Sequence, residues 1–140
     1  MSSVALDIHI DGASRGNPGD AGFGVHVTLR DGSELAGLYG FLGKATNNVA
    51  EYQALIHALR FAIGRGASDV RVFSDSELVV KQMNGQYKVK HPDMIPLHRE
   101  ARSLLGKLPK VSLSHVRREQ NRDADRLANR ALDEKASRLS

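Results

Sequence analysis

Four acidic residues stand at places in the chain where a lone carboxylate is costly. Asp11 and Asp75 each end a short apolar segment, and Glu51 and Asp125 lie near the start of helical patterns. Carboxylates that gather without a cation repel one another, and a divalent ion relieves that repulsion. Oxygen ligands favour Mg²⁺ or Mn²⁺ over zinc, and two such ions can promote hydrolysis of a phosphodiester. The four acids therefore predict a metal site that folding assembles.

Glu51 gives the clearest signal among the four acids. On a helix of 3.6 residues per turn it shares a face with Leu55 and Leu59, so it is expected to be buried. The alternative is a structural role, because Asn48 followed three residues later by Glu51 fits a capping box. A metal ligand would explain both its position and its face.

The other three acids have structural alternatives that the sequence leaves open. Asp11 with Gly12 could begin a turn, and Asp75 could cap the helix that follows it. Asp125 lies at the margin of an apolar helical stripe, where it could be an exposed acid paired with a basic residue one turn away. Only their meeting at one point would distinguish a site from these local roles.

Alternating and periodic apolar residues predict an α/β protein. Strands are expected over residues 4–10, 23–29, 34–42, 70–74 and 110–116, with a turn-rich loop over 12–22 and a hairpin turn at 31–32. Helices are expected over residues 48–64, 76–83, from between 92 and 96 to 105, and 121–136. The first three strands would form an antiparallel meander, and two later strands would join the first in parallel. The result is a mixed five-stranded sheet with helices on its faces, in which Asp11 and Asp75 share the carboxyl edge.

Composition sets the class of the protein. With 140 residues, 41% of them hydrophobic, the chain predicts one domain over 1–136 and a frayed tail over 137–140. It has no Cys, which excludes disulfides and thiolate chemistry.

The charge is unevenly distributed along the chain. The first 70 residues carry five Lys and Arg against seven Asp and Glu, and the last 70 carry fifteen Lys and Arg against nine Asp and Glu. A basic half that meets phosphate is consistent with nucleic-acid binding, although ordinary solvated side chains explain the charge equally well. No long apolar run or leader is evident, so we expect a cytoplasmic protein without a membrane span or an obligate protein partner.

Four segments together carry a resemblance to a known family. They are residues 11–19 (DGASRGNPG), 46–51 (TNNVAE), 73–76 (FSDS) and 121–128 (NRDADRLA). In this order and spacing they resemble type 1 ribonuclease H over nearly the whole chain. The resemblance implies a ribonuclease H-like fold and an endonuclease that hydrolyses the RNA strand of an RNA–DNA hybrid, leaving a 3′-hydroxyl and a 5′-phosphate.

The resemblance also implies roles for particular residues. With substrate present, Asp11 would bridge two Mg²⁺ or Mn²⁺ ions, Glu51 and Asp75 would complete the shell of one, and Asp125 would hold the other. Side chains around a glycine-containing turn and the start of a helix would read RNA 2′-hydroxyls; these residues are Gly16, Asn17, Asn47 and Asn48. A DNA-strand phosphate would be held by Lys44, Thr46 and Asn84. Turn or capping roles remain the alternatives for Asn17 and for 46–48.

The sequence departs from the family pattern in two places. The loop after His115 is short and carries Arg118 and Glu119 where much of the family has a second His, so we expect altered turnover, with Arg118 contacting the scissile or product phosphate. His115 itself is interpreted as a strand or interface residue. Residues 86–98 are too short and too lightly charged for the basic protrusion of some members, which resembles the compact subgroup of archaea and some bacteria. The residues in and near this stretch that remain to bind a hybrid are Lys81, Lys88, Lys90 and Tyr87.

Three other functions remain compatible with this pattern. A noncatalytic hybrid-binding module could keep the fold without activity, and an integrase-like or junction-resolving nuclease could share the architecture. A structural domain whose acids serve only as caps is the third. Cleavage of a labelled hybrid, activity on DNA alone and divalent-ion binding distinguish them.

Overall fold

The computed structural model of the chain describes residues 4–140 and contains one five-stranded sheet in the order β3-β2-β1-β4-β5. Its strands are β1 (Ala5–Gly16), β2 (Gly19–Leu29), β3 (Glu34–Ala45), β4 (Asp69–Ser74) and β5 (Val111–His115). The first three strands pair antiparallel, β4 runs parallel to β1, and β5 runs parallel to β4. The expected meander with two added parallel strands is confirmed.

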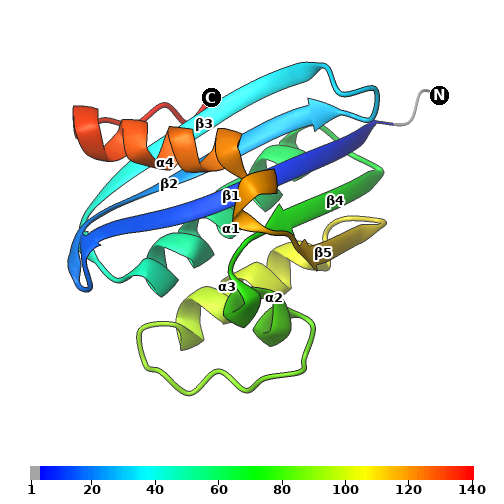
Figure 1. Cartoon of the computed structure of the whole chain (residues 1–140). Helices are drawn as coiled ribbons and strands as arrows, with labels where there is room; N and C mark the ends of the chain where they lie inside the picture. The colour runs from blue at the N-terminus through cyan, green and yellow to red at the C-terminus, as the bar shows by residue number, and fades with distance from the viewer. Residues whose placement is uncertain (1–3) are drawn as a thin grey trace.

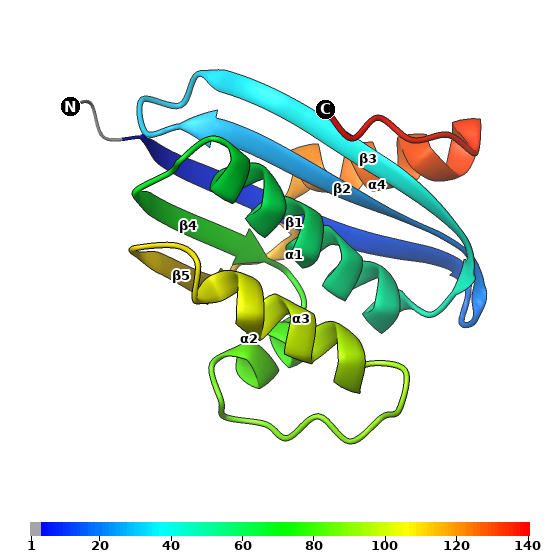
Figure 2. The same cartoon turned by 180° about the vertical axis from the view of Figure 1, so that it is seen from behind.

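Helices cover the two faces of the sheet unequally. They are α1 (Asn47–Gly64), α2 (Glu77–Met83), α3 (Ile95–Leu105) and α4 (Arg122–Glu134), with a 3₁₀ turn η1 (Arg118–Gln120) before the last. Figure 1 shows α4 crossing β1, β2 and β3 on one face, and Figure 2 shows α1 and α3 side by side on the other. β4 ends at Ser74, opposite Ile10 in the middle of β1, and α4 begins near this point, because Asn121 before it bonds the Ile10 carbonyl. α1 begins farther along β1, where the Asn47 N–H bonds Asn17.

The main core lies between the sheet and α1. Leu6, Ile8 and Ile10 alternate along β1 and are fully buried against it. Leu55 and Leu59 of α1 meet them from the other side, as their spacing predicted. A second, smaller cluster under α4 contains Tyr39, Leu127 and Ala131. Within residues 4–140, no helix is both long and apolar enough to cross a membrane.

The segment expected to be a turn-rich loop is largely strand. Pairing continues from Gly12 opposite Phe23 to Gly16 opposite Gly19, so only Asn17 and Pro18 remain outside the β1–β2 ladder. The prediction of a loop over 12–22 was wrong because glycines lower strand propensity in isolation, whereas here both strands of a ribbon pair throughout. β3 likewise runs on to Ala45 beside this ribbon.

The structural alternatives for Glu51 and Asp75, in which each acid caps a helix, do not hold, whereas the capping alternative for residues 46–48 holds at Thr46. The side chain of Thr46 caps α1 by accepting a hydrogen bond from the Val49 N–H at 3.2 Å, so Asn48 and Glu51 form no capping box. Ser76 caps α2 in the same way, which leaves Asp75 just outside the helix with no capping role. A hydroxyl one or two residues away was the better acceptor in both cases.

Within the segment that the sequence predicts to be a frayed tail, residues 137–140, Arg138 pairs with Tyr39 of β3. After α4 ends at the left-handed Lys135, Arg138 forms an isolated bridge with Tyr39 through N–H to O distances of 2.8 and 2.9 Å. Its guanidinium lies 5.2 Å from the Tyr39 ring centroid and donates to the Gly37 carbonyl. Edge strand β3 therefore supplies backbone partners that the sequence of the tail did not indicate.

Candidate active site

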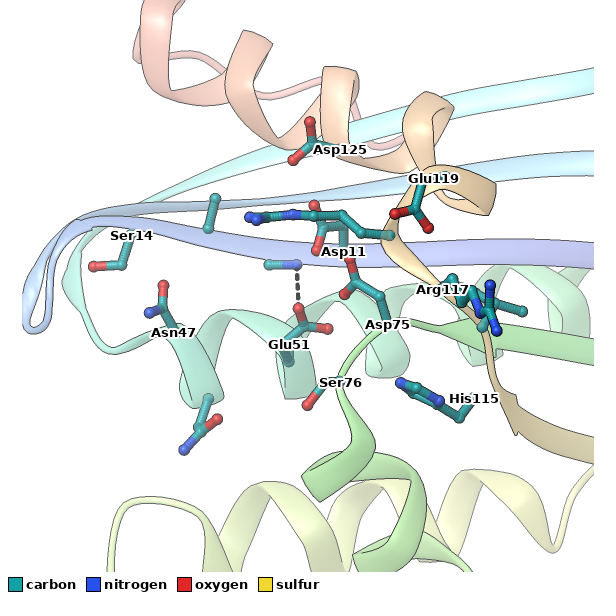
Figure 3. Close-up of a pocket in the computed structure, with 15 residues that line it drawn as sticks. Asp11, Ser14, Asn47, Glu51, Asp75, Ser76, His115, Arg117, Glu119 and Asp125 are labelled. Atoms are coloured by element: carbon teal, nitrogen blue, oxygen red, sulfur yellow. Dashed lines mark hydrogen bonds between the residues drawn. The ribbon is translucent and has the colours of Figure 1, made fainter.

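Three of the four acids converge at the carboxyl edge of the sheet. Asp11 lies in β1, Asp75 directly follows β4, and Glu51 comes from the second turn of α1. Each offers a carboxylate oxygen, and these oxygens all lie within 4.8 Å of one another. In Figure 3 the three side chains point toward one another from their separate elements. Parallel pairing of β1 with β4 brings two of them together, and packing of α1 on β1 brings the third.

Asp125 completes one side of the same pocket. It lies in the first turn of α4, and Figure 3 shows its carboxylate on the α4 side of the pocket, next to Asp11. Asn129, one turn later, donates its side-chain amide to an Asp125 carboxylate oxygen at 3.3 Å. The fourth acid thus lines the pocket while standing outside the tight cluster.

The pocket is open and mainly polar in its lining. Its volume is about 850 Å³. Its walls come from residues 11–14 of β1, the start of α1, the segment after β4, the end of β5, the residues before α4 and the first turn of α4. The lining residues are Asp11, Gly12, Ala13, Ser14, Asn47, Asn48, Glu51, Asp75, Ser76, His115, Val116, Arg117, Arg118, Glu119 and Asp125.

Close approach of α1 to β1 holds Glu51 in place. The Gly12 N–H donates to Glu51 Oε1 at 2.9 Å, and the Ser74 hydroxyl lies 3.5 Å from Oε2. A Cβ on Gly12 would stand 2.4 Å from the Glu51 backbone nitrogen, so only glycine permits this contact. The backbone N–H of Gly12, the residue after Asp11, therefore orients the Glu51 carboxylate.

Burial and mutual repulsion make these carboxylates hard to ionise. Asp11 is 5% exposed, and burial together with the charges of Glu51 and Asp75 raises its pKa well above the usual range. Glu51 is 6% exposed, and burial also raises its pKa, although the Gly12 N–H opposes the shift. None of the largest contributions to either pKa shift comes from a basic side chain. An oxygen-only donor set without a cationic partner fits a hard divalent ion.

The residues expected to read RNA lie on one side of the pocket. Asn47 and Asn48, at the start of α1, belong to its lining. Asn17 lies next to them, because its side-chain oxygen accepts the Asn47 N–H at 3.1 Å. Gly16, with φ of 104°, begins the turn that presents Asn17. These four residues form a continuous rim, although Gly16 and Asn17 are outside the pocket lining itself.

The expected phosphate ligands divide between two places. Lys44 and Thr46 line a separate cavity of about 700 Å³ beside the start of α3. Asn84 caps the end of α2, and its side-chain amide donates to the Leu113 carbonyl at 3.2 Å. Arg118, by contrast, is exposed and lines the acidic pocket. The structure therefore groups Lys44 with Thr46 and does not bring Asn84 into their cavity.

Several residues near the acids had no role in the site predicted from the sequence. Ser74 and Asn121 are buried polar residues beside the site, and His115 lines the pocket, although it was interpreted as a strand or interface residue. Ser14 and Glu119 also contribute to the lining. Buried polar residues next to motif acids could have been suspected from their neighbours. In the loop after β5, the sequence predicted a role for Arg118 but none for Glu119, because the course of the chain there depends on tertiary packing.

Known proteins are similar to this chain over most of its length. The family model described as reverse transcriptase-like matches residues 9–131. A bifunctional protein of Mycobacterium tuberculosis is 48% identical over 127 residues, which cover 90% of this chain and 35% of that protein. Ribonuclease HI of Halobacterium salinarum is 44% identical over 126 residues, covering 90% of this chain and 63% of the relative. The chain thus spans about a third of the first relative and under two thirds of the second. Ribonuclease H of Methylococcus capsulatus is 33% identical, covering 90% of this chain and 88% of the relative.

Solved structures agree with these relatives. RNase H1 from Halobacterium salinarum matches with a TM-score of 0.89 and 43% identity, covering 93% of this chain and 98% of that one. LC11-RNase H1, solved in complex with an RNA/DNA hybrid, matches with a TM-score of 0.88 and 40% identity over 93% and 98% of the two chains. Given this likeness, the matching fold and the converging acids, the chain belongs to the type 1 ribonuclease H family.

Proposed function

We propose that the protein is an endoribonuclease that hydrolyses the RNA strand of RNA–DNA hybrids. The observation that supports this most strongly is the meeting of Asp11, Glu51 and Asp75 in an open pocket that Asp125 also lines. Membership of the type 1 ribonuclease H family and the hybrid bound by LC11-RNase H1 support the same substrate. An open pocket on the surface suits a long duplex better than a small enclosed ligand.

In this proposal the four acids hold two Mg²⁺ ions, or Mn²⁺ in their place, when substrate is bound. Asp11, between the other acids, would contact both ions, Glu51 and Asp75 would hold one, and Asp125 the other. The ions would activate the attacking water and stabilise the leaving oxygen, giving 3′-hydroxyl and 5′-phosphate ends. The chain's own contribution is to fix the carboxylates through burial and the Gly12 N–H, so that little reorganisation is needed on binding.

The rim of the pocket would select RNA. Asn47 and Asn48 lie beside the acids, and their amides can donate to and accept from a 2′-hydroxyl. Asn17 and Gly16 would extend this contact along the strand, because Asn17 is hydrogen-bonded to Asn47. A DNA strand in the same place lacks the hydroxyl and would leave these amides without partners.

Cationic and neutral polar side chains around the pocket would hold phosphates of both strands. Lys44 and Thr46 line the neighbouring cavity, outside the acidic pocket, where they would meet the second strand of a duplex. Asn84 remains a proposed member of this group, although its amide already donates to Leu113. Arg118 would contact the scissile or product phosphate from the loop before α4. A cytoplasmic location and the lack of an obligate protein partner stay predictions.

The experiment compares an RNA–DNA hybrid, an RNA duplex and a DNA duplex of one sequence, each incubated with the protein with and without Mg²⁺. We expect Mg²⁺-dependent cleavage of the RNA strand of the hybrid, with 5′-phosphate ends detected by their response to phosphatase and kinase. Cleavage of the DNA duplex would instead favour an integrase-like or junction-resolving nuclease. Binding of the hybrid without cleavage would favour a noncatalytic module, and either result would overturn the proposal.

A further inference from the structure

Asn121 is the most deeply buried polar side chain near the acids that has no assigned role. It is 1% exposed and lies between η1 and α4. Although it occupies the position before α4, its side chain makes no capping hydrogen bond there. Asn is favoured before a helix because its side-chain oxygen usually caps it. Here the side chain points elsewhere, so capping does not explain it.

The side chain instead connects α4 to the catalytic end of β1. Its Nδ2 donates to the carbonyl oxygen of Ile10 at 2.8 Å, and Ile10 directly precedes Asp11. Ile10 is also the last residue of β1 that pairs with β4. A buried carbonyl without a partner is costly, so this bond is strongly favoured. Because the alternative amide orientation would set two oxygens against each other, the Ile10 carbonyl also fixes which way the amide faces.

The backbone of Asn121 continues the connection to the fourth acid. Its carbonyl oxygen accepts the Asp125 N–H at 3.1 Å, the first hydrogen bond of α4. Its own N–H donates to the Arg118 carbonyl at 3.0 Å. One residue therefore ties the backbone next to Asp11, the loop that carries Arg118 and the turn that carries Asp125.

We infer that Asn121 is a positioning residue that sets the distance between Asp125 and Asp11. The inference deepens the proposed function and rests on it. Asp125 is not one of the three grouped acids and enters the pocket from α4, so its position depends on where α4 begins. Of the side-chain hydrogen bonds in residues 4–140, the Asn121 bond alone joins the start of α4 to the backbone of β1 at the acids. Asn121 Oδ1 is also the single buried side-chain polar atom without a partner among those residues, an acceptor left for a water molecule at the site.

Three measurements on Asn121→Ala test this inference. Loss of the anchor should raise the Mg²⁺ concentration for half-maximal hybrid cleavage by roughly tenfold or more, since removing a residue that orients a metal ligand weakens metal binding 10- to 100-fold. KM for the hybrid should stay near the wild-type value, because Asn121 makes no hydrogen bond to the residues proposed to contact RNA, which are Gly16, Asn17, Asn47 and Asn48. In the metal-free protein, amide hydrogen exchange of residues 122–128 should become about tenfold faster.

The matched control is Tyr52→Phe. It removes a buried hydrogen bond of the Tyr52 hydroxyl to Gln82 at 2.5 Å, so it imposes a comparable loss away from the pocket. We expect this control to leave the Mg²⁺ midpoint and the exchange of α4 at their wild-type values. If Asn121→Ala does not fold, Asn121→Ser is measured in the same way, with the same expected direction.

Each outcome separates the inference from the proposed function. An unmoved Mg²⁺ midpoint in Asn121→Ala, or an equal shift in Tyr52→Phe, overturns the positioning role while the nuclease assignment stands. A wild-type protein that cleaves no hybrid at any Mg²⁺ concentration overturns the proposed function. In that case hydrogen exchange alone tests the positioning role of Asn121. Faster exchange of residues 122–128 in Asn121→Ala supports that role, and unchanged exchange overturns it.

Discussion

At the scale of single residues, the chain stores electrostatic repulsion where it is proposed to bind metal. Asp11 and Glu51 are buried beside Asp75, and their pKa values are raised because burial and neighbouring negative charge oppose ionisation. The sequence predicted the convergence because residue types, strand ends and a buried helix face all agreed. It did not predict Gly12 and Ser74 as the partners of Glu51, since those contacts depend on how closely α1 approaches β1.

The substitution Asp11→Asn should therefore stabilise the metal-free protein while abolishing cleavage. A raised pKa in the folded state means that the wild-type protein loses stability as pH rises above the ordinary carboxyl range near about 4. We expect the variant to be more stable than wild type at pH 7, by roughly 1 to 3 kcal/mol, with the difference shrinking toward pH 4. Calorimetric melting at both pH values checks this, and saturating Mg²⁺ should favour the wild type. Destabilisation of Asp11→Asn at pH 7 without metal would contradict it.

Arg118 offers a second test at this scale. It is exposed and lines the acidic pocket from the loop between β5 and α4. If it contacts a phosphate at the scissile bond, Arg118→Ala should lower kcat for hybrid cleavage roughly tenfold at saturating Mg²⁺. Exposed Arg126, paired with Asp123 on α4, provides a control of equal charge change. A rate unchanged from wild type would remove Arg118 from the site.

At the scale of elements, the strands and helices were predictable where the pattern is local. The alternation of β1, the apolar faces of α1 and α4 and the parallel placement of β4 and β5 all follow from periodicity and connection rules. The ribbon from Gly12 to Gly22 and the bridge of Arg138 to Tyr39 do not, because pairing between strands supplies hydrogen bonds that no local signal reveals. The caps were missed by one or two residues, within the usual uncertainty of helix boundaries.

One ion-pair cluster connects β1, β4 and the segment after β2, at the end of these strands away from the acids. Asp7 of β1 accepts two hydrogen bonds from Arg71, its register partner on β4, at 2.6 and 2.7 Å, and one from Arg30 after β2 at 2.7 Å. Partial burial opposes ionisation of Asp7, yet the two Arg side chains outweigh it and lower its pKa. The cluster thus stabilises the alignment of β1 with β4, on which the meeting of Asp11 and Asp75 depends.

Asp7→Asn should cost about 1 kcal/mol of stability at pH 7, a value kept small because Arg71 is 47% exposed and solvent screens the pair. A lowered pKa in the folded state gives stability that is present above the ordinary Asp pKa and lost as pH falls through the lower folded value. The difference between variant and wild type should therefore narrow below about pH 4. Denaturant unfolding across pH 2.5 to 7, roughly the range over which Asp titrates, measures it. Asp133→Asn, which breaks an exposed pair with Arg15, serves as the control and should change little; an Asp7 effect independent of pH would contradict the account.

At the scale of the whole molecule, the charged residues are unevenly distributed. The acids gather in one pocket, and the excess of Lys and Arg lies in the second half of the sequence. Without a large basic protrusion, α2, α3 and the segment between them still present cations around a cavity of about 560 Å³ that includes Lys88, Lys90 and Arg99. A duplex that lies across the acidic pocket would bring its phosphates near these Lys and Arg side chains.

Binding of a hybrid should consequently weaken steeply with salt. For about three phosphate contacts, raising monovalent salt from roughly 50 to 200 mM should lower the affinity on the order of 10- to 100-fold, because each contact releases counterions. Fluorescence anisotropy with Asp75→Asn, which prevents cleavage during the titration, measures the slope. An uncharged stacking interaction would give a flat dependence instead.

The most direct test of the central claim measures Mg²⁺-dependent cleavage of an RNA–DNA hybrid labelled on the RNA strand, in wild type and in Asp75→Asn. If distant carboxylates form one metal site, the wild type cleaves the RNA and the variant, folded to the same degree by circular dichroism, loses activity by at least about a thousandfold. Cleavage by the folded variant at a rate close to wild type would contradict the account.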